Sequence, residues 1–379
     1  MSLVYLDCAA TSLWRPICVA EAVSRSIILH AGYGRNRSPS SDAASGEVFM
    51  CREALARMFN VKDPSNIVFC YNATHALNTA IFGLVQKGRS CVISGYEHNA
   101  VRRPLCELAR REETETVIAQ SSLFDEKDCI RAFEEAIEKS TPGLVVCTAV
   151  GNVFGNIMPV EEIGKLCRAK GAAFVVDASQ GAGVIPLDAE KIGADAICMP
   201  GHKGLLGPTG TGVMILGKRN FAPFVFGGTG MSSEDEGQPE TSPERFESGT
   251  LNVCGICGLG AAVRYIEDNG KAIHAKKQAL CEIIADVLAQ RGFHIFASNG
   301  NFETCMFSFD AGFDSEIAAE MLASRRIVVR GGLHCAPLAH ISAGTFERGT
   351  VRVSPQADLN RRTAKKTAQI IADVLDRNR

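Results

Sequence analysis

The sequence predicts an α/β protein organised around a mainly parallel sheet, and two observations support this prediction. The chain contains several continuous apolar runs of strand length, which span 67–71, 91–94, 144–149, 173–177, 194–199 and 213–216. Segments with the apolar spacing of helices separate most of these runs. Strands that are apolar on both faces and alternate with helices are typical of a parallel sheet covered by helices on each side.

Helices are predicted from the amino terminus onward. The expected helical segments are 19–30, 43–59, 75–85, 160–170, 252–291, 315–325 and 358–376. Ser41 or Asp42 is expected to cap the second of these helices, and Asn72, Ala73 and Thr74 open the third.

The character of the chain changes after residue 216. Residues 227–243 are rich in glycine, serine, proline and acids, and they are expected to form a functional or mobile loop. Shorter strands are expected farther on, at 303–309, 327–329 and 350–354. Because helices are mixed with these strands, the sequence predicts a second, α+β lobe.

Composition excludes several classes of function. Charged residues make up 22% and hydrophobic residues 46% of the 379 residues, as in ordinary soluble globular proteins. A formal net charge of −2 gives no electrostatic reason to expect nucleic acid or an anionic membrane as a partner. No apolar run approaches the roughly 20 residues that a membrane helix needs. The 15 cysteines are scattered singly and follow no secretory signal, so we expect reduced thiols in the cytoplasm.

A metal site is not expected. Cys254 and Cys257 could form half of a metal site or a redox dithiol, but no second pair stands at a suitable spacing. The pair is therefore interpreted as small residues that pack a helix.

Polar residues follow five of the expected strands. They are Asn72 and Thr74, His98, Asn152, Asp177 and Gln180, and His202 and Lys203. Each has a simpler explanation as a turn residue, a helix cap or a hydrogen-bonded histidine, which is favoured for Asn152 and Thr74 taken singly. Because ligands bind at the carboxyl ends of parallel strands, the five positions together predict one site.

Lys203 is the centre of this predicted site. It lies in a turn rich in glycine and proline, 200–212, and no acid stands beside it in the sequence. Most lysines are solvated surface cations. A lysine at the mouth of two buried strands, however, can lose hydration, so that its pKa falls and its amine becomes nucleophilic toward a carbonyl.

Nine motifs, read in order, resemble those of the class V aminotransferases, a family of pyridoxal-phosphate enzymes, and in particular its cysteine desulfurase and selenocysteine lyase branch. The motifs are YLDCAAT (5–11), NATHALN (72–78), EHNA (97–100), NVFG (152–155), DASQ (177–180), GHK (201–203), FESGT (246–250), RGGLHC (330–335) and VRVS (351–354). The resemblance implies fold type I, with a mainly parallel seven-stranded sheet between helices in a large domain. It implies a large domain over 16–255 and a small α+β domain over 1–15 and 256–379.

The resemblance also implies roles at the cofactor ring. Lys203 would hold pyridoxal phosphate as a Schiff base and then carry a proton, and Asp177 would pair with the pyridine nitrogen. Gln180 would hydrogen-bond the phenolic oxygen, and His98 would stack on the ring. The alternatives are a capping aspartate for Asp177 and a capping or core histidine for His98.

The cofactor phosphate would lie at the helix start after Ala73 and Thr74, with His202 close by. Thr250 matches a position that reaches this phosphate across a homodimer interface. Pro200 departs from the pattern, because many relatives have a serine there that supplies a hydroxyl contact to the phosphate.

Substrate roles follow from the same resemblance. Asn152 and Arg352 would hold the substrate carboxylate, the arginine with two hydrogen bonds. Cys335 would attack the substrate sulfur as a thiolate, which leaves a persulfide and L-alanine. Its alternative is a small buried hydrophobic residue, as expected for Cys147 and Cys198.

Glycines 331 and 332 place Cys335 in a short turn, which resembles the group II enzymes that pass sulfur to an acceptor protein. L-Selenocysteine in place of L-cysteine, and another class V lyase reaction, remain open. Outside the family, a cysteine hydrolase could use Cys335 with His334 or His340, and a binding protein with an inactive site is a further alternative.

Overall fold

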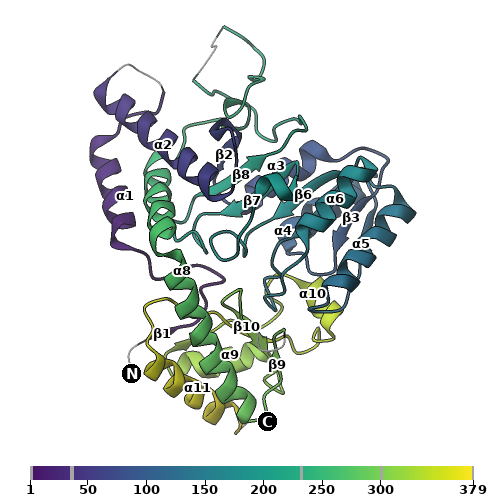
Figure 1. Cartoon of the computed structure of the whole chain (residues 1–379), viewed down its shortest axis with the longest axis vertical. Helices are drawn as coiled ribbons and strands as arrows, with labels where there is room; N and C mark the ends of the chain where they lie inside the picture. The colour runs from purple at the N-terminus through teal and green to yellow at the C-terminus, as the bar shows by residue number, and fades with distance from the viewer. Residues whose placement is uncertain (1–2, 35–37, 231–233, 299–301, 378–379) are drawn as a thin grey trace.

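A seven-stranded sheet in the order β2-β8-β7-β6-β5-β3-β4 forms the centre of the larger lobe in the structure, a computed structural model that describes residues 3–34, 38–230, 234–298 and 302–377 (Figure 1). Its strands are β2 (Ile67–Cys70), β3 (Cys91–Ser94), β4 (Thr116–Ala119), β5 (Leu144–Thr148), β6 (Ala173–Asp177), β7 (Ala196–Pro200) and β8 (Gly212–Leu216). Strand β8 runs antiparallel to both of its neighbours, β2 and β7, and the other neighbouring strands of this sheet pair in parallel. The predicted mainly parallel sheet is confirmed.

Helices cover both faces of this sheet. They are α2 (Pro39–Met58), α3 (Ala73–Leu84), α4 (Asn99–Arg110), α5 (Glu126–Ser140), α6 (Val160–Lys170), α7 (Ala189–Ile192) and the first turns of α8 (Val253–Gln290). Cys91 and Ile93 of β3 pack with α3 and α4, whereas Val92 packs in the core that contains α2, α5 and α6. Because alternate side chains are buried on opposite faces, the strands appear in the sequence as continuous apolar runs.

A smaller lobe is built from both ends of the chain. Its strands and helices are β1 (Val4–Tyr5), β9 (Ile295–Phe296), β10 (Phe307–Phe309), β11 (Ile327–Val328), β12 (Val351–Val353), α9 (Ser315–Ser324), α10 (Pro337–Ala343) and α11 (Arg361–Leu375). One apolar core joins Val4 and Leu6 to side chains from Leu280 onward. Helix α8 runs from the larger lobe down into this one (Figure 1). The division at 1–15, 16–255 and 256–379 stays a prediction.

Two predicted boundaries are wrong by four residues, the start of α2 and the start of β10. Helix α2 begins at Pro39 instead of 43, and its cap is Ser38, whose side chain accepts a hydrogen bond from the Ser41 amide, instead of Ser41 or Asp42. Proline suits a first helical position because its φ is already helical. The strand expected over 303–309 shortens to β10, because Cys305 has a φ of +55° and turns the chain.

The remaining elements are α1 (Ile17–Leu29) and two 3-10 turns, η1 (Pro64–Asn66) and η2 (Glu244–Phe246). The expected loop 227–243 contains neither helix nor strand where it is described, and 231–233 lie outside the described residues. In the described part of the chain, no helix has both the length and the hydrophobicity to cross a membrane.

Candidate active site

Loops at the carboxyl ends of the parallel strands surround a cavity of about 110 Å³. Its walls are formed by Asn72, Ala73, Thr74, His98, Ala100, Thr148, Val150, Asn152, Asp177, Ser179, Gln180, Pro200, His202 and Lys203. Eight of these are the site residues predicted for the five strand ends. The topology of the sheet therefore brings together groups that are up to 131 positions apart, from Asn72 to Lys203.

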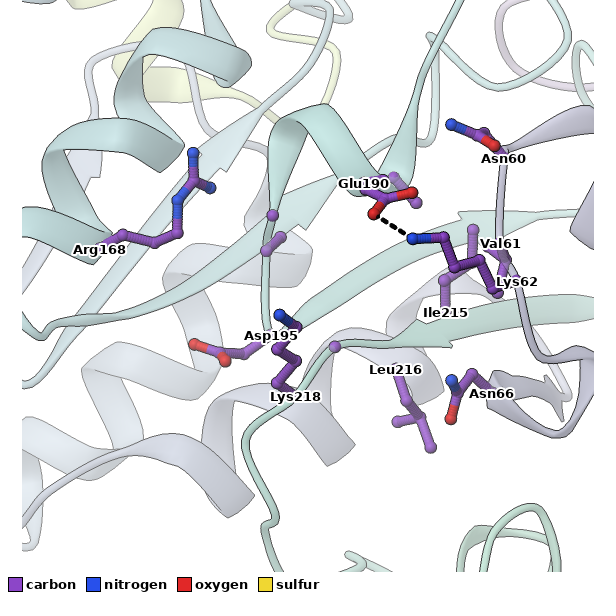
Figure 2. Close-up of a pocket in the computed structure, with 14 residues that line it drawn as sticks. Asn60, Val61, Lys62, Asn66, Arg168, Glu190, Asp195, Ile215, Leu216 and Lys218 are labelled. Atoms are coloured by element: carbon purple, nitrogen blue, oxygen red, sulfur yellow. Dashed lines mark hydrogen bonds and ion pairs between the residues drawn. The ribbon is translucent and has the colours of Figure 1, made fainter.

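A larger cavity of about 580 Å³ lies at the opposite end of the sheet, where β7 begins and β8 ends (Figure 2). There the Lys62 ammonium pairs with the Glu190 carboxylate at 2.6 Å. None of the predicted site residues lines this cavity. The smaller cavity is therefore the candidate active site.

Lys203 follows β7 and projects into the candidate site. Burial lowers its pKa to about 8, because the ammonium loses hydration, and the positive charges of Arg352 and Arg330 act in the same direction. The Asp177 carboxylate opposes this shift in pKa. At neutral pH the amine is therefore far more nucleophilic than that of a surface lysine.

Asp177 and His98 line the same cavity. The Asp177 carboxylate is buried at the end of β6, where Oδ1 accepts a hydrogen bond from the Ser179 amide at 2.9 Å. His98 caps α4, because its Nδ1 accepts from the Ala100 amide at 3.0 Å. That bond leaves the hydrogen on Nε2, and burial lowers the pKa of His98 so that the ring is neutral.

Gln180 is also buried, and its amide nitrogen donates to the carbonyl oxygen of Ala9 at 2.9 Å. A carboxamide nitrogen carries two hydrogens, so the second stays available to a ligand. This hydrogen bond holds the N-terminal segment around Ala9 against the site.

The start of α3 offers an anion-binding position. Asn72 caps the helix by accepting from the His75 amide at 2.9 Å. The amides of Ala73 and Thr74 fall in the first turn, where helical N–H groups have no intrahelical acceptor. Gly212 packs against Asn72, and a Cβ there would lie 2.6 Å from the Asn72 carbonyl carbon.

His202 is fixed beside this position by a contact of 3.0 Å between its Nδ1 and the Thr11 hydroxyl. Burial lowers the pKa of His202 to about 4, so the ring is neutral. Pro200 lines the cavity without offering a hydroxyl. Thr250 lines a separate cavity of about 330 Å³, so this chain alone does not bring it to the candidate site.

Arg352 is fully buried beside the cavity, and two of its nitrogens are engaged. Nη2 pairs with Asp7 Oδ1 at 2.7 Å, and Nη1 donates to the carbonyl oxygen of Asn152 at 2.8 Å. Nε has no hydrogen-bond partner among the described residues. A buried donor without a partner is costly, so this edge of the guanidinium is suited to receive a carboxylate.

Cys335 is exposed and lies in a turn against the start of α4, where its carbonyl oxygen accepts from the Asn99 amide at 2.7 Å. Asn99 directly follows His98, so the cysteine stands at the edge of the site. The guanidinium Nη2 of Arg330 lies 3.4 Å from the sulfur.

Sequence reasoning assigned no role to Asp7 or Arg330. Asp7 lies in the motif YLDCAAT and Arg330 in the motif RGGLHC. Membership in these motifs was the one feature of the sequence that could have indicated a role for them. The contact of Asp7 does not follow from a local pattern, because Asp7 and Arg352 are 345 positions apart.

The described residues contain no group of three or more histidine, cysteine, aspartate or glutamate side chains that could hold a metal ion. Cys254 and Cys257 both lie in α8, and Cys257 is buried.

Comparison with known proteins gives consistent matches. The family model described as aminotransferase class-V matches residues 4–361. A probable cysteine desulfurase of Methanothermobacter thermautotrophicus is 32% identical over 364 residues, which cover 93% of this chain and 89% of that protein. The cysteine desulfurase CsdA of Escherichia coli is 28% identical, with 93% and 88% covered. The apo structure of a cysteine desulfurase from Thermococcus onnurineus superposes with a TM-score of 0.89 at 29% identity, and 99% of this chain and 95% of that one are covered.

Proposed function

This chain belongs to the aminotransferase class-V family, and from that membership and the site geometry we propose that it is a pyridoxal-phosphate-dependent cysteine desulfurase. It converts L-cysteine to L-alanine and leaves the sulfur on Cys335 for transfer to an acceptor. The names of its relatives support this reaction. The observation that carries the proposal is the position of the exposed Cys335. Its carbonyl oxygen accepts from the Asn99 amide, and Asn99 directly follows His98, which lines the same cavity as Lys203.

The residues present fit pyridoxal phosphate. The desolvated amine of Lys203 can bind its aldehyde, and the buried Asp177 carboxylate can face its pyridine nitrogen. The first-turn amides of Ala73 and Thr74, with neutral His202, suit its phosphate. When bound, the cofactor supplies an electron sink for negative charge at the substrate Cα.

The His98 ring and the second amide hydrogen of Gln180 can contact the cofactor ring and its phenolic oxygen. Lys203 then moves the proton at the substrate Cα, a task for which an amine with a pKa near 8 is well matched. The Asp177 carboxylate places a negative charge close to both the Lys203 amine and the pyridine ring of the cofactor.

Arg352 and Asn152 hold the substrate carboxylate. The free Nε–H of the guanidinium donates a hydrogen bond to the carboxylate, while Asp7 and the Asn152 carbonyl fix the orientation of the guanidinium. The Asn152 side chain lines the cavity and can donate its second amide hydrogen.

Cys335 takes the sulfur. Its thiolate attacks the substrate sulfur, so that an S–S bond forms as the Cβ–S bond breaks. The electron pair of the broken bond stays with carbon, which is protonated to give alanine. The persulfide on this exposed residue is then open to attack by the thiol of an acceptor.

A homodimer and a cytoplasmic location belong to the proposal. Ile17, Ile27 and Ile28 of α1 are 74%, 67% and 78% exposed, which supports a partner surface on this helix. Thr250, which lies away from the site of its own chain, would reach the phosphate of the other protomer. All 15 cysteines, each within the described residues, are free thiols, which supports a reducing compartment.

The reaction is tested by measuring alanine formed from L-cysteine in the wild type, Cys335→Ala and Cys106→Ala. Cys106 is the matched control, because it is the other exposed cysteine. We expect Cys335→Ala to lose activity and Cys106→Ala to keep it. Full turnover of cysteine by Cys335→Ala would overturn the proposed role of this residue.

L-Selenocysteine serves as the competing substrate in the same assay. A protein that turns over selenocysteine but not cysteine would instead be a selenocysteine lyase. Purified protein should be yellow and lose its colour in Lys203→Ala, whereas a cysteine hydrolase would be colourless.

A further inference from the structure

We infer that His340 is a positioning residue for sulfur transfer, because it holds, through the imidazole of His334, the turn that carries Cys335. The inference rests on the proposed function of Cys335. His340 belongs to α10 and does not line the active-site cavity, so it acts on the reaction only through this turn.

The turn has an unfavourable backbone conformation. His334 has a φ of +53° and Cys335 a φ of +56°, so two successive residues with side chains are left-handed. For a residue with a side chain, this conformation brings Cβ too close to the following carbonyl oxygen and is disfavoured. Backbone of this kind persists only where its surroundings hold it in place.

Hydrogen bonds to the main chain provide part of that support. The Asn152 amide nitrogen donates to the His334 carbonyl oxygen at 2.8 Å, and the Asn99 amide donates to the Cys335 carbonyl oxygen at 2.7 Å. Both bonds restrain carbonyl groups. The side chain of His334 is held separately.

That side chain has one defined tautomer. His334 Nε2 lies 3.1 Å from the carbonyl oxygen of Arg330, which can only accept, so Nε2 carries the hydrogen. Nδ1 is then an acceptor, and it lies 3.5 Å from Nε2 of His340. His340 must therefore donate from Nε2, and its Nδ1 accepts from the Thr345 hydroxyl at 2.7 Å.

The two rings have the arrangement that this chain of bonds requires. Their planes differ by 11° and their centroids are 5.7 Å apart, which fits nearly coplanar rings joined edge to edge. Both side chains are buried. Burial lowers the pKa of His340 to about 4 and that of His334 well below its usual value, so both rings are neutral at physiological pH.

The test compares His340→Leu with His340→Gln in the holoenzyme. Glutamine keeps an N–H donor close to the position of Nε2, whereas leucine fills the space without a donor. We expect His340→Leu to lower kcat for alanine formation about tenfold, an energy of about 1.4 kcal/mol, with KM for L-cysteine changed less than about twofold. His340→Gln should retain most of kcat.

A second pair of variants tests the far end of the chain of bonds. Thr345→Val removes the hydroxyl that donates to His340 Nδ1 and so keeps the ring hydrogen on Nε2. This variant should lower kcat, as His340→Leu does, whereas Thr345→Ser keeps the hydroxyl and should not. If His340→Leu fails to fold, this pair carries the test. Equal kcat values in folded Thr345→Val and Thr345→Ser would then overturn the inference.

The position of the sulfur is measured independently of catalysis. Holoenzyme without cysteine is treated with iodoacetamide, and peptide mass spectrometry gives the alkylation rate of Cys335 relative to exposed Cys106. We expect this ratio to change at least about threefold in His340→Leu and to stay near the wild-type value in His340→Gln. An unchanged ratio together with an unchanged kcat in His340→Leu would overturn the inference. Activity retained in Cys335→Ala would instead refute the proposed function, whatever the alkylation ratio.

Discussion

The lowered pKa of Lys203 predicts how fast the apo protein captures its cofactor at each pH. Only the neutral amine attacks an aldehyde. A pKa of about 8 in place of 10.5 is a difference of 2.5 units, which at pH 7 gives about 300 times more neutral amine than an ordinary lysine has. The capture rate should therefore rise about tenfold per pH unit up to about pH 8 and then level off.

The assay mixes apo protein with excess pyridoxal phosphate and follows the absorbance of the bound cofactor between pH 6 and about pH 10.5. Free Nα-acetyl-lysine is the control for the titration of the cofactor itself, and its rate should keep rising to about pH 10.5. A protein rate that also rises to that pH would refute the claim that burial lowers the pKa of Lys203.

The variant Asp177→Asn tests how the negative charge of Asp177 affects the pKa of Lys203. The Asp177 carboxylate raises the pKa of Lys203 against the effect of burial. Asp177→Asn should therefore move the plateau to lower pH, even though this variant binds the cofactor more weakly. A shift of the plateau to higher pH would contradict the arrangement of charges.

Three further predictions concern other buried groups. Arg352→Gln should raise KM for L-cysteine by about 10- to 150-fold, because a charge-assisted carboxylate contact worth about 1.5–3 kcal/mol is lost, and steady-state kinetics of alanine formation would show it. Burial raises the pKa of Glu97 to about 8, so the stability that its protonated form contributes is present below its ordinary pKa of 4.5 and is lost as the pH rises through 8. Urea midpoints at about pH 6 and pH 9 should therefore differ more in the wild type than in Glu97→Gln. Arg52→Leu leaves Glu247 buried without the partner that it contacts at 2.5 Å, and it should lower the free energy of unfolding by about 3–5 kcal/mol in urea denaturation.

The sequence could predict the sheet and the site because both follow from local patterns combined with one rule of topology. Residues 144–147 and 173–176 are all apolar because both faces of β5 and β6 are covered by helices. Once the strands are parallel, their carboxyl ends meet at one edge. The residues that follow them, Asp177 and Lys203 among them, then line one cavity.

Three other features of the structure could not be predicted, because no local pattern in the sequence indicates them. Strand β4 (Thr116–Ala119) lies at the edge of the sheet and is only partly buried, so it lacks the continuous apolar run that marks the central strands. The partner of Arg352 comes from Asp7 at the opposite end of the chain. The bond between His334 and His340 depends on the orientation of α10, which no spacing in the sequence specifies.

Incubation of the holoenzyme with L-cysteine in the absence of any acceptor thiol tests the central claim most directly. After quenching, mass spectrometry measures the sulfur content of the Cys335 peptide, and alanine is counted in the same sample. The proposed mechanism predicts one additional sulfur atom on Cys335 for each alanine formed in the first turnover. Alanine formed while Cys335 stays unmodified, or sulfur found on a different cysteine, would contradict it.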